Sequence, residues 1–510
     1  MHALVHSATT IGIHAYPVEV EVDLSMGLIG FRIVGLPDKA INESTDRIRA
    51  AFKNSGLILP EKFITVNLAP ASLKKEDILF DLPIAVAILQ AAKLADIQAE
   101  FVADSLFLGE LSLDGRIRPV RGVLSIVHAA MQAGKKRVII PEQNAREASL
   151  IEGIDVIGVS SLTQVVGYLR GEISIQPIQS TFQKAVETPK HLVDFDQVKG
   201  QQTAKRALQI AAVGRHNILL IGSPGSGKTM LARRLVTILP SMSFDEIIQT
   251  TKIYSVAGLL DNQALITERP FRAPHHTISQ AGLVGGGTTP RPGEISLASQ
   301  GVLFLDEMPE FARATLEVLR EPLESGTVHI SRASCAVEYP AHFLLVAAMN
   351  PCPCGYFGDR KKQCTCQPQQ VAKYVAKLSG PLLDRIDLHV NVASINYDEI
   401  KDVSLTGKSS AELYKEVARA VAVQEARFGA MRNARMNATQ VEQYCVLTPA
   451  AEQIVRLAFD KLGMSMRGYH KILKIARTIA DLDGADLIDR KHVQEAIMYR
   501  SLDQAPRVGQ

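Results

Sequence analysis

The stretch that most constrains the fold of this chain is GSPGSGKT, residues 222–229. It lies between an apolar run, ILLI, and a segment with helical character, so the pattern G-x-x-x-x-G-K-[ST] predicts a loop joining a strand to a helix. Glycines let backbone N–H groups curl around phosphate oxygens, and the dipole of the following helix attracts the same charge. Lys228 is expected to reach the β- and γ-phosphates of a nucleotide. The predicted nucleotide contacts are Gly222, Ser223, Pro224, Gly225, Ser226, Gly227, Lys228 and Thr229.

A second apolar run, GVLFL at residues 301–305, leads directly into two carboxylates. Asp306 is expected to hold Mg²⁺ with Thr229, directly or through water, and Glu307 to orient and activate the attacking water. Asn350 ends a further apolar strand, where it is placed to hold that water or the γ-phosphate. The two motifs in this order, on alternating strands and helices, predict an ATPase built on a parallel α/β sheet, with ATP and Mg²⁺ as cofactors.

Two arginines are candidates for stabilising charge in the transition state. Arg385, in GPLLDRIDL, could point at ATP in the next subunit, and Arg467, on a C-terminal helix, could sense the phosphate. From spacing alone, each is equally consistent with a surface ion pair.

The chain has 510 residues, which is too long for a single hydrophobic core, so several domains are expected. Residues 64–68 and 137–141 predict strands and residues 81–95 a helix, while residues 466–482 place apolar side chains on one helical stripe. We predict an N-terminal domain that mixes strands and helices, a linker, an α/β core and a helical domain, at residues 1–175, 176–192, 193–395 and 396–510.

The bulk composition excludes few classes of partner. The formal net charge is only +3, which leaves a polyanionic partner open without requiring one. The N-terminus MHALVHSATT lacks a signal-peptide pattern, and we find no apolar run near the roughly 18–20 residues of a membrane helix. We therefore expect a cytoplasmic chain with no membrane partner.

Four of the six cysteines lie within residues 352–366, in the pattern C-x-C-x9-C-x-C. A reducing compartment disfavours a disulfide, and four thiolates in two close pairs suit tetrahedral zinc. The C-x-C spacing is less usual than C-x2-C, and the alternative is a loop with reduced, partly exposed thiols. The candidate Zn²⁺ ligands are Cys352, Cys354, Cys364 and Cys366.

Together these residues resemble the magnesium-chelatase-like branch of the AAA+ ATPases and, within it, the bacterial ComM/YifB family. The resemblance implies a central P-loop parallel sheet with helices on both faces, and a C-terminal helical lid. It also implies an insert in helix 2, within about residues 250–300, and a β-hairpin at residues 326–340. The resemblance is most specific at residues 271–307, 346–355, 378–388 and 476–482.

The same resemblance implies a homohexameric ring that acts as a DNA translocase or helicase. It would promote branch migration of recombination intermediates during natural transformation, with recombination proteins as further partners. Arg385 becomes the expected arginine finger and Arg467 the sensor of the helical domain. The alternative is a magnesium-chelatase-type motor subunit that acts on a protein partner rather than DNA. Candidate DNA contacts in the pore are Arg332, Arg272, Arg291 and His276, although the PHH sequence is also consistent with helix-cap or core histidines.

The N-terminal domain resembles the proteolytic domain of the Lon protease, most clearly at residues 133–169. Lon uses a Ser/Lys dyad. Where Lon has its nucleophile loop, this chain has ILFDLPIA, residues 78–85, which contains no serine, and no lysine occurs between residues 102 and 134. Acyl transfer needs both groups. We therefore expect a Lon-protease-like α+β domain without protease activity, used for ring assembly or partner docking.

Overall fold

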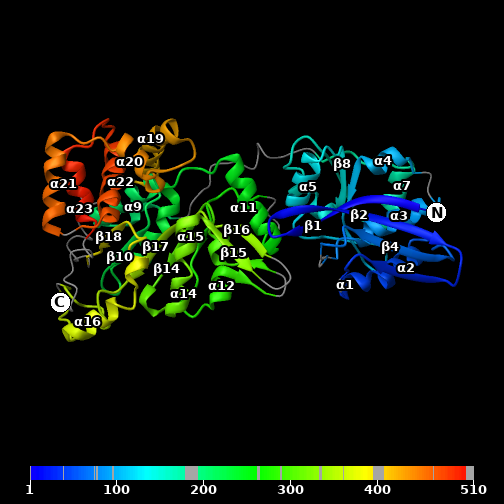
Figure 1. Ribbon diagram of the computed structural model, residues 1–510, viewed down its shortest axis with the longest axis horizontal. Helices are drawn as coiled ribbons and strands as arrows, with labels where there is room; N and C mark the ends of the chain where they lie inside the picture. Colours follow the sequence, from blue (N-terminus) through cyan, green and yellow to red (C-terminus); the bar gives the residue numbers. More distant parts are fainter. Residues whose placement is uncertain are drawn as a thin grey trace.

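The computed structural model describes residues 2–37, 39–73, 75, 78–94, 97–178, 193–260, 265–287, 290–331, 336–359, 361–393, 407–462 and 464–500. Figure 1 shows an N-terminal α/β part at one end of the long axis, a second α/β part in the middle, and a cluster of helices at the other end. The predicted linker and the start of the helical domain fall largely on residues 179–192 and 394–406, which lie outside the described residues.

The N-terminal part is built on a seven-stranded mixed sheet in the order β3-β4-β2-β1-β5-β8-β9. Strands β1, β2 and β4 pair antiparallel, and the other neighbours pair parallel. The strands predicted at residues 64–68 and 137–141 are confirmed as β4 and β8. The bounds are β1 (His2–Ile11), β2 (His14–Ser25), β3 (Gly30–Val34), β4 (Phe63–Ala69), β5 (Ser105–Phe107), β8 (Arg137–Pro141) and β9 (Asp155–Val159), with a small ribbon of β6 (Glu110–Leu111) and β7 (Ile117–Arg118).

Helix α3 is buried along almost its whole length, which explains its apolar sequence. Its first residue is Asp81, at the segment where the Lon nucleophile loop was expected. The buried Asp81 carboxylate accepts hydrogen bonds from Arg47 Nε (2.7 Å) and Nη2 (3.0 Å) and from the N–H of Leu111 (3.1 Å). The helices here are α1 (Lys39–Asn42), α2 (Ser44–Asn54), α3 (Asp81–Ala91), α4 (Ala99–Ala103), α5 (Val123–Gln132), α6 (Ala145–Ala148) and α7 (Leu162–Leu169).

The central part is an all-parallel sheet in the order β11-β14-β17-β10-β18. Alternate residues of β10 pack into two different cores, Ile218 and Leu220 into one and Leu219 and Ile221 into the other, so both faces of the sheet are covered. Strands buried on both faces read as continuous apolar runs, as these do. The bounds are β10 (Ile218–Ile221), β11 (Phe271–Arg272), β14 (Val302–Leu305), β17 (Leu344–Met349) and β18 (Leu388–Asn391).

Two small hairpins occupy the regions predicted for the insert and the β-hairpin. They are β12 (Gly285–Gly286) with β13 (Arg291–Pro292), and β15 (Thr327–Ser331) with β16 (Ala336–Pro340). The helices of this part are α9 (Gln202–Gly214), α10 (Lys228–Arg234), α11 (Phe244–Ala257), α12 (Gln280–Val284), α13 (Glu294–Leu297), α14 (Arg313–Glu317), α15 (Arg320–Ser325), α16 (Pro368–Val375) and α17 (Gly380–Leu383).

The C-terminal part is helical, as predicted, and the apolar stripe of α22 is buried at Ile472, Ile475, Ala476, Ile479 and Leu482. Among the residues that the structure describes, no helix combines the length and apolar composition needed to cross a membrane. The helices are α19 (Ser410–Phe428), α20 (Ala438–Tyr444), α21 (Pro449–Leu462), α22 (Met466–Asp483) and α23 (Arg490–Met498).

Candidate nucleotide site and cysteine cluster

The loop between β10 and α10 needs its glycines. Gly225 and Gly227 have φ values of +78° and +92°, in the left-handed region that favours glycine. At Gly222 a Cβ atom would lie 2.3 Å from the carbonyl oxygen of Val392, so a side chain there would collide with the backbone. The predicted phosphate-binding loop therefore has the backbone that its sequence pattern requires.

Lys228 begins α10 and turns back over this loop. Its Nζ donates to the carbonyl oxygens of Gly222 (2.7 Å) and Ser223 (3.0 Å) and to Oδ1 of Asn350 (3.2 Å). Burial lowers the pKa of Lys228, while the charges of Asp306 and Glu307 act in the opposite direction. Asn350 follows β17, the strand next to β10, so the parallel sheet brings these two predicted site residues together at its carboxyl edge.

Thr229 and the end of β14 form the second half of the site. Thr229 Oγ1 donates to Oδ2 of Asp306 (2.7 Å), and the N–H of Glu307 donates to the other carboxylate oxygen (3.0 Å). A hydroxyl and a carboxylate are hard oxygen ligands, so this pair fits Mg²⁺. Glu307 has a φ of +51° and an exposed side chain. His276 Nδ1 lies 3.7 Å from Glu307 Oε2, a contact that sequence reasoning did not predict.

Arg385 and Arg467 line one surface cavity of about 360 Å³, together with Arg435, Lys471 and Lys474. This cavity lies at the edge of the sheet opposite to the phosphate-binding loop. The carbonyl oxygen of Arg385 accepts from Asn217 Nδ2 (2.9 Å), just before β10, whereas the loop follows β10. Four strand residues at roughly 3.3 Å each separate the two edges by about 13 Å. Neither arginine therefore approaches the loop of its own chain.

The four predicted DNA contacts have different surroundings. Arg332 lies outside the described residues. Arg272 donates to both carboxylate oxygens of Glu294, at 2.6 and 2.7 Å, so its guanidinium is already engaged. Arg291, on β13, is exposed, and His276 faces Glu307 as described above. Among the candidates that the structure describes, Arg291 is exposed, whereas the side chains of Arg272 and His276 are each 32% exposed.

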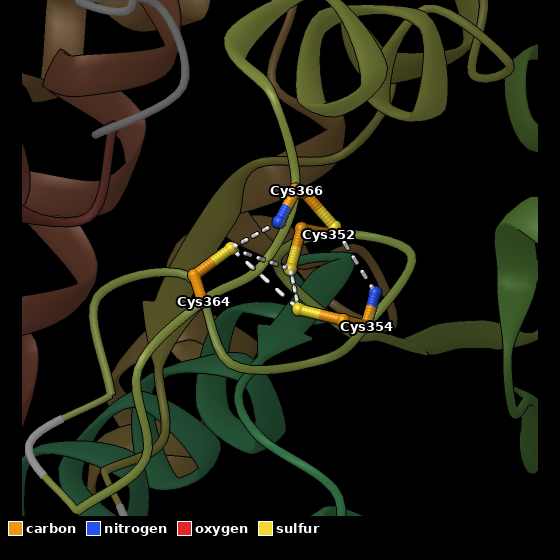
Figure 2. Close-up of side chains that lie close together, drawn as sticks. All are labelled: Cys352, Cys354, Cys364 and Cys366. Atoms are coloured by element: carbon orange, nitrogen blue, oxygen red, sulfur yellow. Dashed lines mark hydrogen bonds between the residues drawn. The ribbon is translucent and has the colours of Figure 1, made fainter.

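The four predicted zinc ligands converge on one point (Figure 2). One ligand atom from each of the four lies within 4.8 Å of those of the others. The Sγ atom of Cys352 lies 3.3 Å from that of Cys354 and 3.7 Å from that of Cys364, and the last two sulfurs are 3.5 Å apart. These distances are far longer than the roughly 2.05 Å of a disulfide, and the four cysteines are free thiols.

Comparison with known proteins covers nearly the whole chain. The family described as "Magnesium chelatase, subunit ChlI" matches residues 194–400. The descriptions "Subunit ChlI of Mg-chelatase" and "Magnesium chelatase, subunit ChlI C-terminal" match residues 20–144 and 407–500. "Competence protein ComM" of Haemophilus influenzae is 45% identical over 506 residues, covering 98% of this chain and 97% of the relative. "Uncharacterized protein YifB" of Escherichia coli is 41% identical over 504 residues, with the same coverage.

A more distant match is the "Magnesium-chelatase 38 kDa subunit" of Rhodobacter capsulatus, 24% identical over 320 residues, or 59% of this chain and 84% of the relative. The parallel sheet, the phosphate-binding loop, the hairpins and the helical C-terminus, with these matches, define a magnesium-chelatase-like AAA+ protein. Within that class, the chain belongs to the ComM/YifB family. Membership in the AAA+ class indicates an ATPase that uses ATP and Mg²⁺.

Proposed function

We propose that this chain is an ATP-driven, hexameric DNA translocase that promotes branch migration of recombination intermediates during natural transformation. The observation that carries the proposal is the separation of two half-sites. Lys228, Thr229 and Asp306 lie at the carboxyl edge of the central sheet, while Arg385 and Arg467 share a basic cavity at the opposite edge. Since one copy holds the arginines away from its own loop, we propose that a second copy completes the site. A ring supplies that copy at every interface.

In the proposed reaction, the backbone of the loop and Lys228 bind the phosphates, and Asn350 orients the γ-phosphate or the attacking water. Thr229 and Asp306 would hold Mg²⁺, which neutralises phosphate charge when bound. The exposed carboxylate of Glu307 accepts a proton from the attacking water. Arg467 of the neighbouring copy, and Arg385 once it leaves its ion pair with Glu324, donate to oxygens on which charge accumulates in the transition state.

DNA is the proposed partner because "Competence protein ComM" is similar over nearly the full length of this chain. The two hairpins pack against each other, which supports the proposal that together they form one element that contacts DNA. Tyr339 on β16 donates through its hydroxyl to the carbonyl oxygen of Pro290 (2.8 Å), the residue before β13. At Gly285 of β12, a Cβ atom would lie 2.8 Å from Ile330 Cδ1 of β15, so the hairpins pack directly on each other. We propose that they line the pore together, with Arg291 contacting phosphates.

We further propose the domain limits 1–175, 193–395 and 396–510, and a Lon-like N-terminal domain that has no protease activity. The position expected for a nucleophile holds the buried Asp81–Arg47 ion pair. An acceptor already satisfied by three N–H donors cannot attack a peptide. Magnesium-chelatase-type action on a protein partner is the competing function, favoured by the match to the 38 kDa subunit.

The test combines ATP hydrolysis, ring assembly and DNA remodelling. We expect the purified chain to form hexamers with ATP and to move a four-way DNA junction, with ATPase activity stimulated by that DNA. Glu307→Gln should retain nucleotide and the ring but lower hydrolysis by at least about 100-fold. Glu310→Gln is the matched control, since Glu310 lies three residues on and pairs with Lys377 at 3.2 Å. Two negative results would contradict the DNA function and favour the chelatase-type alternative: branched DNA does not stimulate ATPase activity, and ATP hydrolysis does not move the junction.

A further inference from the structure

We propose that the cysteine knuckle, defined as residues 352–359 and 361–366, binds one zinc ion and that the bound ion sets the affinity of the phosphate-binding loop for nucleotide. The inference rests on the proposed nucleotide site and adds a regulator to it. Zinc would hold the conformation of the phosphate-binding loop without taking part in ATP hydrolysis. The argument has three steps, which concern the sulfur geometry, the backbone around the sulfurs, and the contacts between the knuckle and the loop.

The sulfur positions fit a single tetrahedral ion. With a Zn–S distance of about 2.3 Å, the sulfurs of a tetrahedral site lie roughly 3.8 Å apart. The three Sγ–Sγ distances among Cys352, Cys354 and Cys364 are 3.3, 3.7 and 3.5 Å, so only small outward shifts are needed around an ion. Cys366 completes the set, within 4.8 Å of the others. Sulfurs this close surround one ion, because an iron–sulfur cluster would hold them further apart.

The backbone of the knuckle is already arranged around the sulfurs. The N–H of Phe357 donates to Cys352 Sγ (3.3 Å), that of Cys354 to Cys366 Sγ (3.4 Å), and that of Cys366 to Cys364 Sγ (3.4 Å). Such N–H···S bonds offset the negative charge that four thiolates leave on a zinc site. The described residues of the knuckle form no helix or strand of their own, so the ion would be the centre that holds this segment together.

The knuckle touches the phosphate-binding loop at two positions. The hydroxyl of Ser223 donates to Oδ2 of Asp359. Gly355, with a φ of +87°, lies so close to Pro224 that a Cβ atom would be 2.6 Å from the Cδ atom of that proline. Asp359 is held in turn by the N–H groups of Lys361 (2.7 Å) and Lys362 (3.1 Å).

A third link runs through the chain itself. Cys352, whose side chain is fully buried, follows Asn350 by two residues, and Asn350 accepts the hydrogen bond from Lys228. The knuckle is therefore joined to Ser223 and Pro224 on one side of the loop and to Lys228 on the other. Loss of the ion would remove the restraint at all three residues. The loop would then lose more conformational entropy when it closes around phosphate, so nucleotide would bind more weakly.

The test measures zinc content and nucleotide affinity separately on the full-length chain. We expect about one zinc per chain after purification without chelator, and tight binding of a fluorescent ATP analogue. Cys364→Ala should lose the zinc and weaken binding of the analogue by about 10-fold. Asp359→Ala should keep the zinc, because Asp359 supplies no sulfur, but still weaken binding by several-fold, since it removes the contact with Ser223 along with the hydrogen bonds from Lys361 and Lys362. Cys445→Ala, at a buried thiol outside the knuckle, is the control that should change neither quantity.

Linkage gives a second readout that does not depend on a variant that folds poorly. If zinc tightens nucleotide binding, then saturating nucleotide must tighten zinc binding by the same factor. Competition with a chromogenic chelator measures the dissociation constant of the wild-type chain for zinc. We expect this constant to be about 10-fold lower when the ATP analogue is present.

Three results would overturn the inference: less than half a zinc per chain, iron in place of zinc, or equal nucleotide affinity in the zinc-loaded and zinc-free chain. Failure of the proposed function looks different. A zinc-loaded wild-type chain that binds no nucleotide removes the ATPase proposal and with it this regulator, whereas a chain that binds nucleotide but ignores DNA removes only the DNA function and leaves the zinc linkage intact.

Discussion

Arg272 and Arg291 were predicted from the sequence as equivalent DNA contacts, but their surroundings separate them. The guanidinium of Arg272 is held by both carboxylate oxygens of Glu294, at 2.6 and 2.7 Å, while Arg291 is exposed on β13. An arginine fixed in a bidentate pair supports the local fold, whereas an exposed arginine on a hairpin is available to a phosphate. The two residues therefore form a matched pair for testing the pore.

We expect Arg291→Ala to weaken DNA binding and to reduce the slope of log K against log salt by about 0.9, the loss of one phosphate contact. Fluorescence anisotropy with duplex DNA over a range of KCl concentrations measures both quantities. Arg272→Ala should leave the salt slope unchanged and lower the thermal midpoint, because Glu294 loses its partner. An unchanged slope for Arg291→Ala would remove this arginine from the DNA interface.

The residue scale also shows what a sequence can predict. Lys228, Asp306 and Glu307 can be assigned because each belongs to a local pattern, a loop motif or a strand end, whose chemistry needs that residue type. The Ser223–Asp359 hydrogen bond and the His276–Glu307 contact cannot be assigned, since each joins segments far apart in sequence and neither belongs to a motif. Only the packing of the chain brings these pairs together.

At the scale of elements, buried strands and amphipathic helices are predictable, but their junctions are not. Strands β4 and β8 and helix α22 match their apolar patterns, because periodicity reports burial directly. The link between α22 and the segment that carries Arg385 has no such signal. Lys471 on α22 donates to the carbonyl oxygens of Asp384 and Ile386, and lies 3.3 Å from Asp387 Oδ1. The ion pair between Lys471 and Asp387 therefore joins the two segments that carry the proposed phosphate-binding arginines, Arg467 and Arg385.

This ion pair makes the contact between the central sheet and α22 sensitive to acid. Burial alone would raise the pKa of Asp387, but Lys471 and the hydrogen bond from His216 outweigh it and hold this pKa well below its usual range. A depressed carboxyl pKa contributes stability above its unfolded value of about 3.9, and that stability is lost as the pH falls below this value. The stabilisation should therefore be complete at pH 7 and decline below about pH 4.

We expect Asp387→Asn to destabilise the contact between the central sheet and α22 by about 2–3 kcal/mol at pH 7, since Lys471 is left largely buried without its counter-ion. The difference from the wild type should shrink as the pH falls below about 4. Urea unfolding followed by circular dichroism measures this, because the chain contains no tryptophan for fluorescence. A difference that is the same at pH 7 and at about pH 2 would contradict the assigned ionisation of Asp387.

At the scale of the whole molecule, the N-terminal part is docked on the central part through buried groups. Met242, Ile247, Ile248 and Leu265 of the central part pack into the N-terminal core. The β1–β2 turn reaches the β15–β16 hairpin, where a Cβ atom on Gly12 would lie 2.4 Å from Val337 Cγ1. Figure 1 shows α11 beside α5 and the β15–β16 hairpin facing the end of the N-terminal sheet. The β15–β16 hairpin is therefore in direct contact with the N-terminal part.

The polar centre of this docking is Glu147, only 8% exposed, whose Oε1 accepts from the hydroxyl of Ser255 on α11 and from the N–H of Leu124 (3.2 Å). Burial raises the pKa of Glu147, and because this carboxyl is buried, a lost hydrogen bond would leave a buried acceptor without a partner. We expect Ser255→Ala to weaken docking by about 1–3 kcal/mol and to split thermal unfolding into two calorimetric transitions. Faster amide exchange should be confined to α5 and α11. Ser241→Ala, at an exposed hydroxyl 3.1 Å from Tyr414 Oη, is the matched control. If both variants unfold as the wild type does, Glu147 and Ser255 do not hold the two parts together.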